Sequence, residues 1–258
     1  MSQPLTTGRR TRTKWFGSDH RLLKEWDHSS DIRLVFDQFD FFLLFPIRSS
    51  KDAESAVKRG LVAVDPGNRT FATSYSEREA VQFKTNRELI WRLQAKIDRL
   101  RSLRQRHLIR NNNAWKKIHR NGQRIRNMVD DLHWQTCAYL TRNYQAIILP
   151  PFEIQKLKAN RLNARVNRDY DTFAHYRFKM RLREKCRTSG TGLYVCGEEY
   201  TSKTCGVCGK LNHHLGSAEI FKCSHCSSVF ERDPSSARNI LIKNIREKTR
   251  IKLRRRRI

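Results

Sequence analysis

Four cysteines in two matched pairs constrain the fold of this 258-residue chain more than any other feature. Cys205 and Cys208 form one C-x2-C pair, and Cys223 and Cys226 form a second pair after a gap of fourteen residues. Each pair makes a tight turn in which two thiolates can face one cation, and two such turns supply the four sulfurs of a tetrahedral zinc site. Because four thiolates leave no open coordination position, we expect Zn²⁺ there to be structural.

The other three cysteines, Cys137, Cys186 and Cys196, are scattered along the chain. An odd total of seven indicates buried or unused thiols in a reducing compartment, not a disulfide framework. His213 and His214 lie between the two pairs and could replace a sulfur. Since four thiolates are available, we expect both histidines to face solvent.

The chain carries a formal charge of +28, from 53 Lys and Arg against 25 Asp and Glu. Nucleic acid is the polyanion that such a surplus favours, because Lys and Arg neutralise phosphates and release their counterions. We expect no membrane partner, since the sequence has neither an amphipathic anchor nor the roughly 20 apolar residues of a membrane helix. A ribosomal or RNA-packaging protein remains open on charge alone. Hydrophobic residues make up 38 %, which is enough for a folded core.

The spacing of apolar residues predicts both strands and helices. Leu89, Leu93 and Ile97 recur at helical spacing in a predicted helical hairpin over residues 86–142, with a break at the three asparagines of residues 111–113. We expect strands within residues 33–47, 60–83, 146–149 and 193–196, and further helices over 173–187 and from after 233 to about 245. This order predicts an α/β architecture with a mixed sheet, and it is similar to the order of ribonuclease-H-like domains.

Three acidic residues stand at the ends of predicted elements. Asp65 ends the apolar strand LVAVD, Glu153 follows the strand AIIL after a short linker, and Asp233 lies just before the last helix. If the two strands are neighbours, all three carboxylates can converge at one strand end. Carboxylates so close stay ionised only with cations between them, and two Mg²⁺ or Mn²⁺ ions suit a phosphodiester substrate. Taken singly, a turn cap, a surface carboxylate and a helix N-cap remain open interpretations.

Three stretches of the chain form a set: GLVAVDPGNRTFAT, AIILPPFE, and YTSKTCGVCG with the later FKCSHCSSVFERDPSSARNI. They resemble, in that order, the first RuvC segment, the second RuvC segment, and the zinc ribbon followed by the third RuvC segment of TnpB. TnpB is a transposon-encoded RNA-guided nuclease, related to Fanzor proteins and to the small type V CRISPR effectors. The form of the second stretch is closer to Fanzor, and HYRFKMRLREKC resembles the helix before the ribbon. The resemblance covers residues 33–246.

The resemblance implies a ribonuclease-H-like (RuvC) mixed sheet with a helical hairpin insertion and an inserted four-cysteine zinc ribbon. It also implies DNA cleavage guided by an RNA, with Asp65, Glu153 and Asp233 as ligands of two Mg²⁺ or Mn²⁺ ions. The basic hairpin would line a nucleic-acid channel, which the charge of +28 favours over a solvated helix face. The residues expected to contact nucleic acid are Arg92, Lys96, Arg99, Arg104, Lys116, Lys117, Arg120, Arg124 and Arg238.

Mapped on this family, the chain divides into six segments. They are a basic tail (1–32), a remnant of a wedge-like β region with a connector (33–59), the nuclease core with the hairpin 86–142 (60–200), the zinc ribbon (201–230), the last RuvC segment and helix (231–247), and a basic tail (248–258). The family's lobe that binds guide RNA and reads the target-adjacent motif is longer than the 64 residues before Asp65. Ser235 and Ser236 stand where the third segment usually has Asn and Ala. A degraded transposon copy, a split product and a compact variant remain open.

We therefore expect a metal-dependent, RNA-guided type of DNA endonuclease. The alternative is a catalytically inactive zinc-ribbon protein, derived from such a nuclease, that binds nucleic acid without cutting it. A ribosomal-type RNA binder would explain the charge and the zinc but not the three acids. The C-terminal KLRRRRI reads equally as a nuclear localisation signal or a phosphate-binding arm. We expect an intracellular protein, nuclear in a eukaryotic or viral setting and cytoplasmic in a bacterium.

Overall fold

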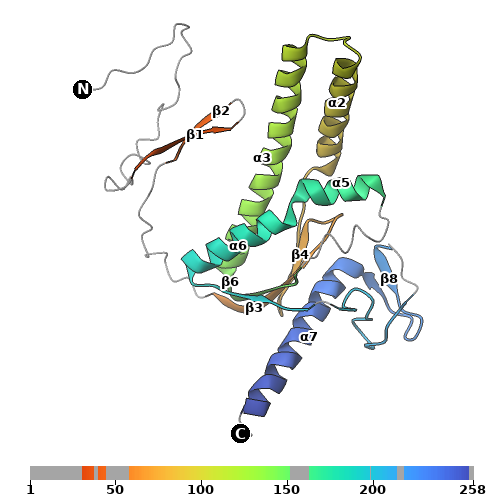
Figure 1. The fold of residues 1–258 in the computed structure, drawn as a ribbon. Helices are drawn as coiled ribbons and strands as arrows, with labels where there is room; N and C mark the ends of the chain where they lie inside the picture. Colours follow the sequence, from red (N-terminus) through yellow and green to blue (C-terminus); the bar gives the residue numbers. More distant parts are fainter. Residues whose placement is uncertain are drawn as a thin grey trace. The chain divides into compact units, whose positions relative to one another are not determined.

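In the computed structural model of the chain, the apolar runs around Val62 and Ile147 form neighbouring strands at the centre of a five-stranded sheet (Figure 1). The structure describes residues 31–37, 40–44, 58–151, 163–197, 199–213 and 218–255, the last ten of them as helix backbone alone. The chain divides into two units, Met1–Ser55 and Ala56–Ile258. Within the described residues, no helix combines the length and apolarity needed to cross a membrane.

The first unit contains a two-stranded antiparallel hairpin, β1 (Arg33–Asp37) and β2 (Asp40–Leu44). Arg33 pairs with Leu44, and Val35 pairs with Phe42. The structure thus shows a hairpin in the segment where the sequence predicts a strand or a hairpin.

The sheet of the second unit is mixed, with the strand order β5-β4-β3-β6-β7. Its strands are β3 (Arg59–Pro66), β4 (Ala72–Tyr75), β5 (Ala80–Phe83), β6 (Tyr144–Leu149) and β7 (Gly192–Val195). β3, β4 and β5 form an antiparallel meander, whereas β6 and β7 run parallel to β3. The predicted α/β class with a mixed sheet is therefore confirmed.

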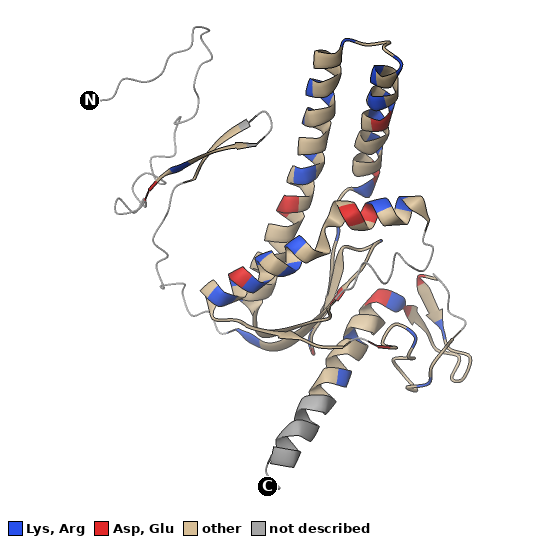
Figure 2. Ribbon diagram, viewed as in Figure 1, with Lys and Arg blue, Asp and Glu red and all other residues tan. Residues whose placement is uncertain are grey.

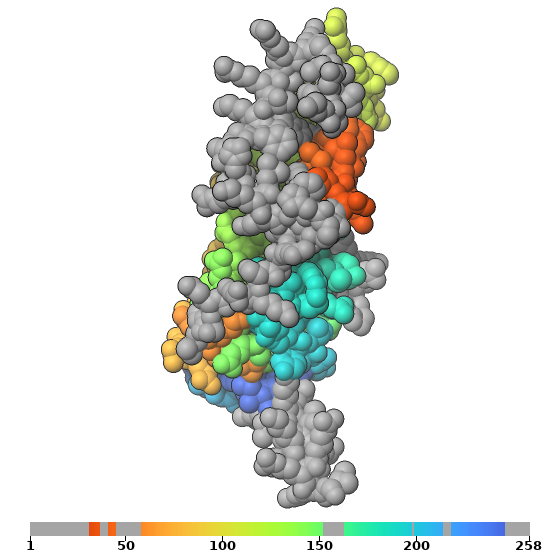
Figure 3. All heavy atoms as spheres, turned by 90° about the vertical axis from the view of Figure 1, so that its left-hand side faces the viewer, coloured from red at the N-terminus to blue at the C-terminus, as the bar shows by residue number. Residues whose placement is uncertain are grey.

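Helices cover both faces of this sheet because side chains alternate along its central strands. Val62 and Ile147 face a core shared with α2 (Arg87–Gln105), α3 (Asn111–Asn143), α5 (Ala164–Phe173) and α6 (His175–Ser189). Ala63 and Ile148 face the other way and pack against Ile240 of α7 (Arg232–Arg255). In the side view, the cyan atoms of α6 lie above the blue atoms of α7 (Figure 3).

Helices α2 and α3 pack side by side and extend away from the sheet (Figure 1). Asn86 caps α2, because its side-chain oxygen accepts a hydrogen bond from the backbone N–H of Leu89 at 2.9 Å. The predicted break at residues 111–113 is wrong. The chain turns at residues 106–110, where His107 adopts a φ of 57°, and the three asparagines form the first turn of α3.

The helix predicted over residues 173–187 is confirmed as α6, which spans His175–Ser189. Ala174 adopts a left-handed conformation with a φ of 47° and separates α5 from α6. The sequence analysis missed α5, whose buried Asp169 accepts hydrogen bonds from the indole of Trp91 at 2.8 Å and from Arg87 at 2.7 Å. This carboxylate ties α5 to α2.

Between β7 and α7 the chain forms a small module with a hairpin of β8 (Ile220–Lys222) and β9 (Val229–Glu231). Phe221 and Phe230 stack across the hairpin with ring centroids 4.9 Å apart. α7 begins at Arg232, directly after β9, so Asp233 lies in the first turn of the helix and not before it.

Candidate functional site

The four paired cysteines converge on one point. Their Sγ atoms all lie within 4.8 Å of one another, with 3.7 Å between Cys205 and Cys226 and 3.6 Å between Cys208 and Cys223. With Zn–S bonds of about 2.3 Å, a regular tetrahedron has sulfur–sulfur edges of about 3.8 Å. The cluster can therefore bind zinc without rearrangement of its sulfurs. His213 is exposed and is not part of the cluster.

The two cysteine turns have the same local structure. The backbone N–H groups of Val207 and His225 donate to the sulfurs of Cys205 and Cys223, each at 3.4 Å. Four residues after each of these cysteines the chain adopts a positive φ, 75° at Gly209 and 58° in the second turn. Backbone N–H groups that point at sulfur stabilise thiolates. The sequence thus builds two equivalent half-sites for one cation.

Hydrogen bonding in the second turn also favours a thiolate. The Ser228 hydroxyl lies 3.1 Å from the Sγ of Cys226. Hydrogen bonds from the side chain and then the backbone of Ser228 lower the pKa of Cys226 to about 6. Since metals bind the thiolate and not the thiol, this turn favours metal binding near neutral pH.

Helix α7 connects the cysteine module with the sheet. The Arg238 guanidinium donates to the carbonyl of Gly206, and the Asn239 amide donates to the carbonyls of Thr201 and Thr204, each at 2.9 Å. A Cβ on Gly206 would lie 2.7 Å from the hydroxyl of Ser235, so α7 approaches the first cysteine turn closely. Arg238, which the sequence predicted to contact nucleic acid, is thus used in the structure to hold the module onto α7.

Two of the three candidate acids lie on elements that pack together. Asp65 is next to last in β3, on the same face as Ala63, which contacts α7. Asp233 precedes Ile240 by seven residues, about 10 Å along the helix axis. The condition that β6 lies beside β3 is met, since the strands are parallel and Ala63 pairs with Ile148. Glu153, three residues beyond Pro150, lies outside the described residues.

A cavity of about 380 Å³ opens beside Asp233. The side chains that line it come from the turn after Asp65, from β5 and the start of α2, and from the cysteine module. Its charged lining residues are Arg69, Lys84, Arg87, Glu219, Glu231 and Asp233. Two contacts join the sheet to the module across it, Arg69 to Glu219 at 2.9 Å and Gln82 to Glu231 at 3.4 Å.

The basic residues of the predicted hairpin are not equivalent in the structure. Blue bands along α2 and α3 mark many of them in Figure 2. Arg92 pairs with Glu88 at 3.2 Å, and the Arg104 guanidinium stacks over the Trp115 ring at 4.3 Å. Lys116 and Arg124 are exposed. The remaining four, Lys96, Arg99, Lys117 and Arg120, line one groove between the two helices.

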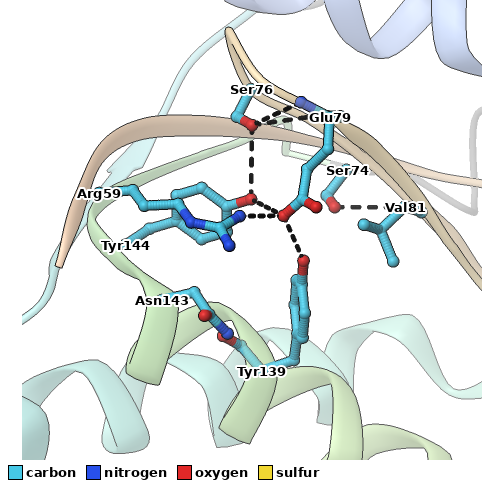
Figure 4. Close-up of polar contacts among 8 residues, drawn as sticks. All are labelled: Arg59, Ser74, Ser76, Glu79, Val81, Tyr139, Asn143 and Tyr144. Atoms are coloured by element: carbon cyan, nitrogen blue, oxygen red, sulfur yellow. Dashed lines mark hydrogen bonds and ion pairs between the residues drawn. The ribbon is translucent and has the colours of Figure 1, made fainter. Parts of the chain in front are cut away.

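A polar cluster at the opposite end of the sheet has no counterpart in the sequence analysis (Figure 4). Glu79, just before β5, forms an ion pair with Arg59 and accepts hydrogen bonds from the hydroxyls of Tyr139 at 2.7 Å and Tyr144 at 3.1 Å. The Tyr139 hydrogen bond contributes most to a lowered pKa of Glu79. Arg59 starts β3, Tyr139 lies near the end of α3, and Tyr144 starts β6, so Glu79 joins these three elements. The sequence shows that these residues are polar, but it does not show which of them form hydrogen bonds or ion pairs with one another.

Comparisons with known proteins place these features in a context. A family described as "Cas12f1-like, TNB domain" matches residues 175–240, which contain α6, β7 and the cysteine module. The chain is 31 % identical over 242 residues to the putative transposase A625R of Paramecium bursaria Chlorella virus 1, covering 90 % of this chain and 53 % of that protein. It is 27 % identical over 253 residues to the TnpB-like protein L79 of Acanthamoeba polyphaga mimivirus, covering 93 % and 44 %. The chain thus spans about half the length of the curated relatives that it matches.

Solved structures share the fold at low sequence identity. A Cas12f1–sgRNA–target DNA complex matches with a TM-score of 0.50 at 17 % identity, covering 69 % of this chain and 48 % of that one. A CRISPR-Cas12f ternary complex matches with a TM-score of 0.52 at 14 % identity, covering 81 % and 44 %. At this identity the likeness concerns the fold.

Proposed function

The chain is a TnpB-type protein related to the small type V effectors, and from this premise we propose that it is a transposon-associated, RNA-guided, metal-dependent DNA endonuclease of the TnpB/Fanzor class. One observation carries the proposal. β3, which ends just after Asp65, packs against α7, which starts just before Asp233, and the parallel strand β6 leads toward Glu153. The carboxyl ends of neighbouring parallel strands meet at one sheet edge, where a ribonuclease-H-like (RuvC) site would lie.

The three acids form a donor set suited to hard divalent cations. Carboxylate oxygens are preferred ligands of Mg²⁺ and Mn²⁺, and carboxylates that share one site repel one another without a cation. When bound, two such ions supply an activated water and stabilise the leaving oxygen of a phosphodiester. Asp65, Glu153 and Asp233 would hold and orient them. Hydrolysis breaks one P–O bond, and the attacking water supplies OH to phosphorus and a proton to the released oxygen.

The cavity beside Asp233 supports a nucleic-acid substrate. Arg69, Lys84 and Arg87 line the same cavity as the candidate catalytic carboxylate. Arg69 and Arg87 pair with Glu219 and Asp169, so Lys84 is the cation of this wall that forms no ion pair within the described residues. Cations there neutralise the phosphates of a strand that approaches the site. DNA as substrate and a guide RNA as partner are further supported by the Cas12f1 structural neighbour, which was solved in a complex with sgRNA and target DNA, although the likeness itself concerns only the fold.

The cysteine module has a structural part in this proposal. Zn²⁺ held by the four thiolates fixes both cysteine turns, and Arg238 and Asn239 connect the first of them to α7. Since Asp233 lies in the first turn of the same helix, zinc positions this carboxylate from a distance. It takes no part in the chemistry, because four thiolates complete its coordination.

A cleavage assay tests the proposal. The chain is purified with its co-expressed RNA and offered single- and double-stranded DNA in Mg²⁺ or in EDTA. We expect the unchanged protein to cut DNA in Mg²⁺ and not in EDTA. We expect Asp65→Ala to cut in neither. The matched control is Asp131→Ala, which removes an exposed carboxylate of α3 and should cut normally. Binding without cutting would instead support a zinc-ribbon nucleic-acid-binding protein derived from such a nuclease.

A further inference from the structure

The paired helices α2 and α3 form a groove whose lining residues carry cations and no acids, and we call this surface the acid-free side. The groove, of about 440 Å³, lies between the helices, with Leu100 and Leu103 among its lining residues. Its cations are Lys96 and Arg99 from α2 and Lys117 and Arg120 from α3, all of them exposed. No carboxylate lines the groove, and in the part of the chain that the structure describes none of these four cations forms an ion pair.

On the opposite side of the same helices most arginines pair with carboxylates of the protein itself, whereas Arg126 donates to the amide oxygen of Gln123. A cavity of about 280 Å³ there has Arg101, Arg126, Arg168, Arg177, Asp130 and Asp171 among its lining residues. Arg168 forms two hydrogen bonds with Asp98, and Asp130 pairs with Arg181 at 2.7 Å and with Arg177 at 3.7 Å. An external anion would have to displace these carboxylates. The groove therefore offers unpaired positive charge to an anionic ligand, whereas most of the positive charge on the opposite side is already paired.

Helical geometry extends the cations of the groove into a row along α3. Successive residues of an α-helix are rotated by about 100°, so Lys117, Arg120 and Arg124 project on the same flank of the buried Ile118, and Arg126 projects on the other. From Lys117 to Arg124 this row spans about 10 Å. A stripe of that length reaches several successive phosphates of a nucleic-acid backbone, whose charges are about 3.4 Å apart per strand along a duplex axis.

The lining also indicates which form of nucleic acid fits. No aromatic residue lines the groove. The exposed Trp115 stacks with Arg104, which is not a lining residue. Sites for single strands combine cations with aromatic rings on which bases stack, whereas a duplex presents its phosphates outward and its bases inward.

We propose that the acid-free side of the α2–α3 pair, formed by Lys96, Arg99, Lys117, Arg120 and Arg124, binds the sugar–phosphate backbone of a nucleic-acid duplex independently of sequence. The inference rests on the nucleic-acid part of the proposed function and not on cleavage. It assigns the duplex to one side of the hairpin and leaves the opposite side without this role.

Two double variants with the same change in net charge test the inference. Lys117→Gln/Arg120→Gln removes two charges from the groove, and Arg101→Gln/Arg126→Gln removes two from the opposite side. All 258 residues are present in the protein that is titrated. EDTA prevents cleavage, and binding is followed by fluorescence anisotropy at several salt concentrations. The probes are a DNA duplex, an RNA duplex, an RNA–DNA hybrid and a single strand of one sequence.

The expected result is a loss confined to the groove variant. Because each lost phosphate contact lowers the salt-dependence slope by about 0.9, the groove variant should lose about 2 from the slope with duplexes, while the control variant changes it by less than about 0.5. Loss with RNA-containing duplexes alone identifies the guide as the source, and equal loss with all duplexes identifies the backbone in general. Equal loss in both variants, no loss in either, or tighter binding of the single strand would overturn the inference.

A second pair of substitutions guards against a folding defect. Lys96→Gln/Arg99→Gln changes the other wall of the groove and should reproduce the loss, with circular dichroism showing unchanged helix content. If the protein does not cut DNA but the groove variants still lose duplex binding, the cleavage proposal is rejected and the present inference is retained. If the protein cuts DNA but the groove variants bind duplexes normally, the cleavage proposal is retained and the present inference is rejected.

Discussion

Gly67 shows how little room the turn after Asp65 has. A Cβ at this position would lie 2.6 Å from the backbone oxygen of Thr70, and the Gly67 N–H already donates to the carbonyl of Phe71 at 3.0 Å. Since the obstructing atom is backbone, the turn itself would have to move. By contrast, a Cβ on Gly60, within β3, meets nothing within 4 Å.

We expect Gly67→Ala to destabilise the fold by about 1–3 kcal/mol and Gly60→Ala to change stability by less than about 1 kcal/mol. Urea unfolding of both variants measures the difference. Because the moving turn adjoins Asp65, Gly67→Ala should also reduce any cleavage activity. Equal stability of the two variants would show that the turn is looser than its geometry indicates.

His133 is a buried neutral histidine in the main core. Its Nε2 donates to the carbonyl of Phe173 at 2.8 Å, and its Nδ1 accepts from Arg181 at 3.2 Å. Burial lowers the pKa of His133 to about 4, and the nearby Arg181 acts in the same direction. The ring also stacks on Phe71 with centroids 5.1 Å apart, so it serves packing and hydrogen bonding together.

This histidine should make stability depend on pH. An unfolded histidine titrates near 6.5, so between about pH 6.5 and pH 4 the unfolded chain binds a proton that the native chain does not. The unfolding free energy should therefore fall as pH drops through this window, by at most about 1.4 kcal/mol per pH unit from this group. His133→Gln should flatten that slope, and substitution of the exposed His107 should not. Parallel slopes for wild type and His133→Gln would contradict the assignment.

At the scale of elements, the cysteine module and α7 act as one unit. The module's own core is small, with Phe221 and two of its cysteines as its buried apolar residues. A core of this size does not stabilise a fold by itself, and small modules commonly gain the missing stability from a bound metal. The hydrogen bonds from Arg238 and Asn239 to the module then position the start of α7.

We expect the purified chain to contain one zinc per molecule, measured by inductively coupled plasma mass spectrometry. Cys226→Ser should lose the zinc and the hydrogen-exchange protection of β8 and β9, while the five-stranded sheet stays protected. Cys196→Ser removes a cysteine outside the cluster and should retain full zinc content. Zinc retained in full by Cys226→Ser would contradict a four-thiolate site.

The elements also show which features the sequence could predict. The cysteine spacing predicted the cluster, and the apolar runs at 61–64 and 146–149 predicted two strands that prove to be neighbours. The boundary between α5 and α6 at Ala174 was not predictable, because a left-handed alanine is not favoured by local preference. The asparagines at 111–113 suggested a break, but at a helix start they are equally favourable.

At the scale of the whole molecule, the charge of +28 is distributed unevenly between surfaces with and without ion pairs. Composition predicted a nucleic-acid partner, and helical spacing predicted basic faces on the hairpin. The difference between an acid-free groove and a side rich in ion pairs depends on Asp98 and Asp130 meeting arginines of α5 and α6 across space. The sequence pattern does not show which residues form ion pairs across space. The acid-free side could therefore be identified only from the structure.

The central claim is that Asp65 and Asp233 serve one metal site. Single-turnover cleavage in Mg²⁺ by wild type, Asp65→Asn, Asp233→Asn and the double variant tests it most directly. If both carboxylates hold the same ions, each single variant should lose activity as completely as the double variant, because groups that act as one unit are strongly non-additive. Independent, additive losses, or full activity in either single variant, would contradict the claim.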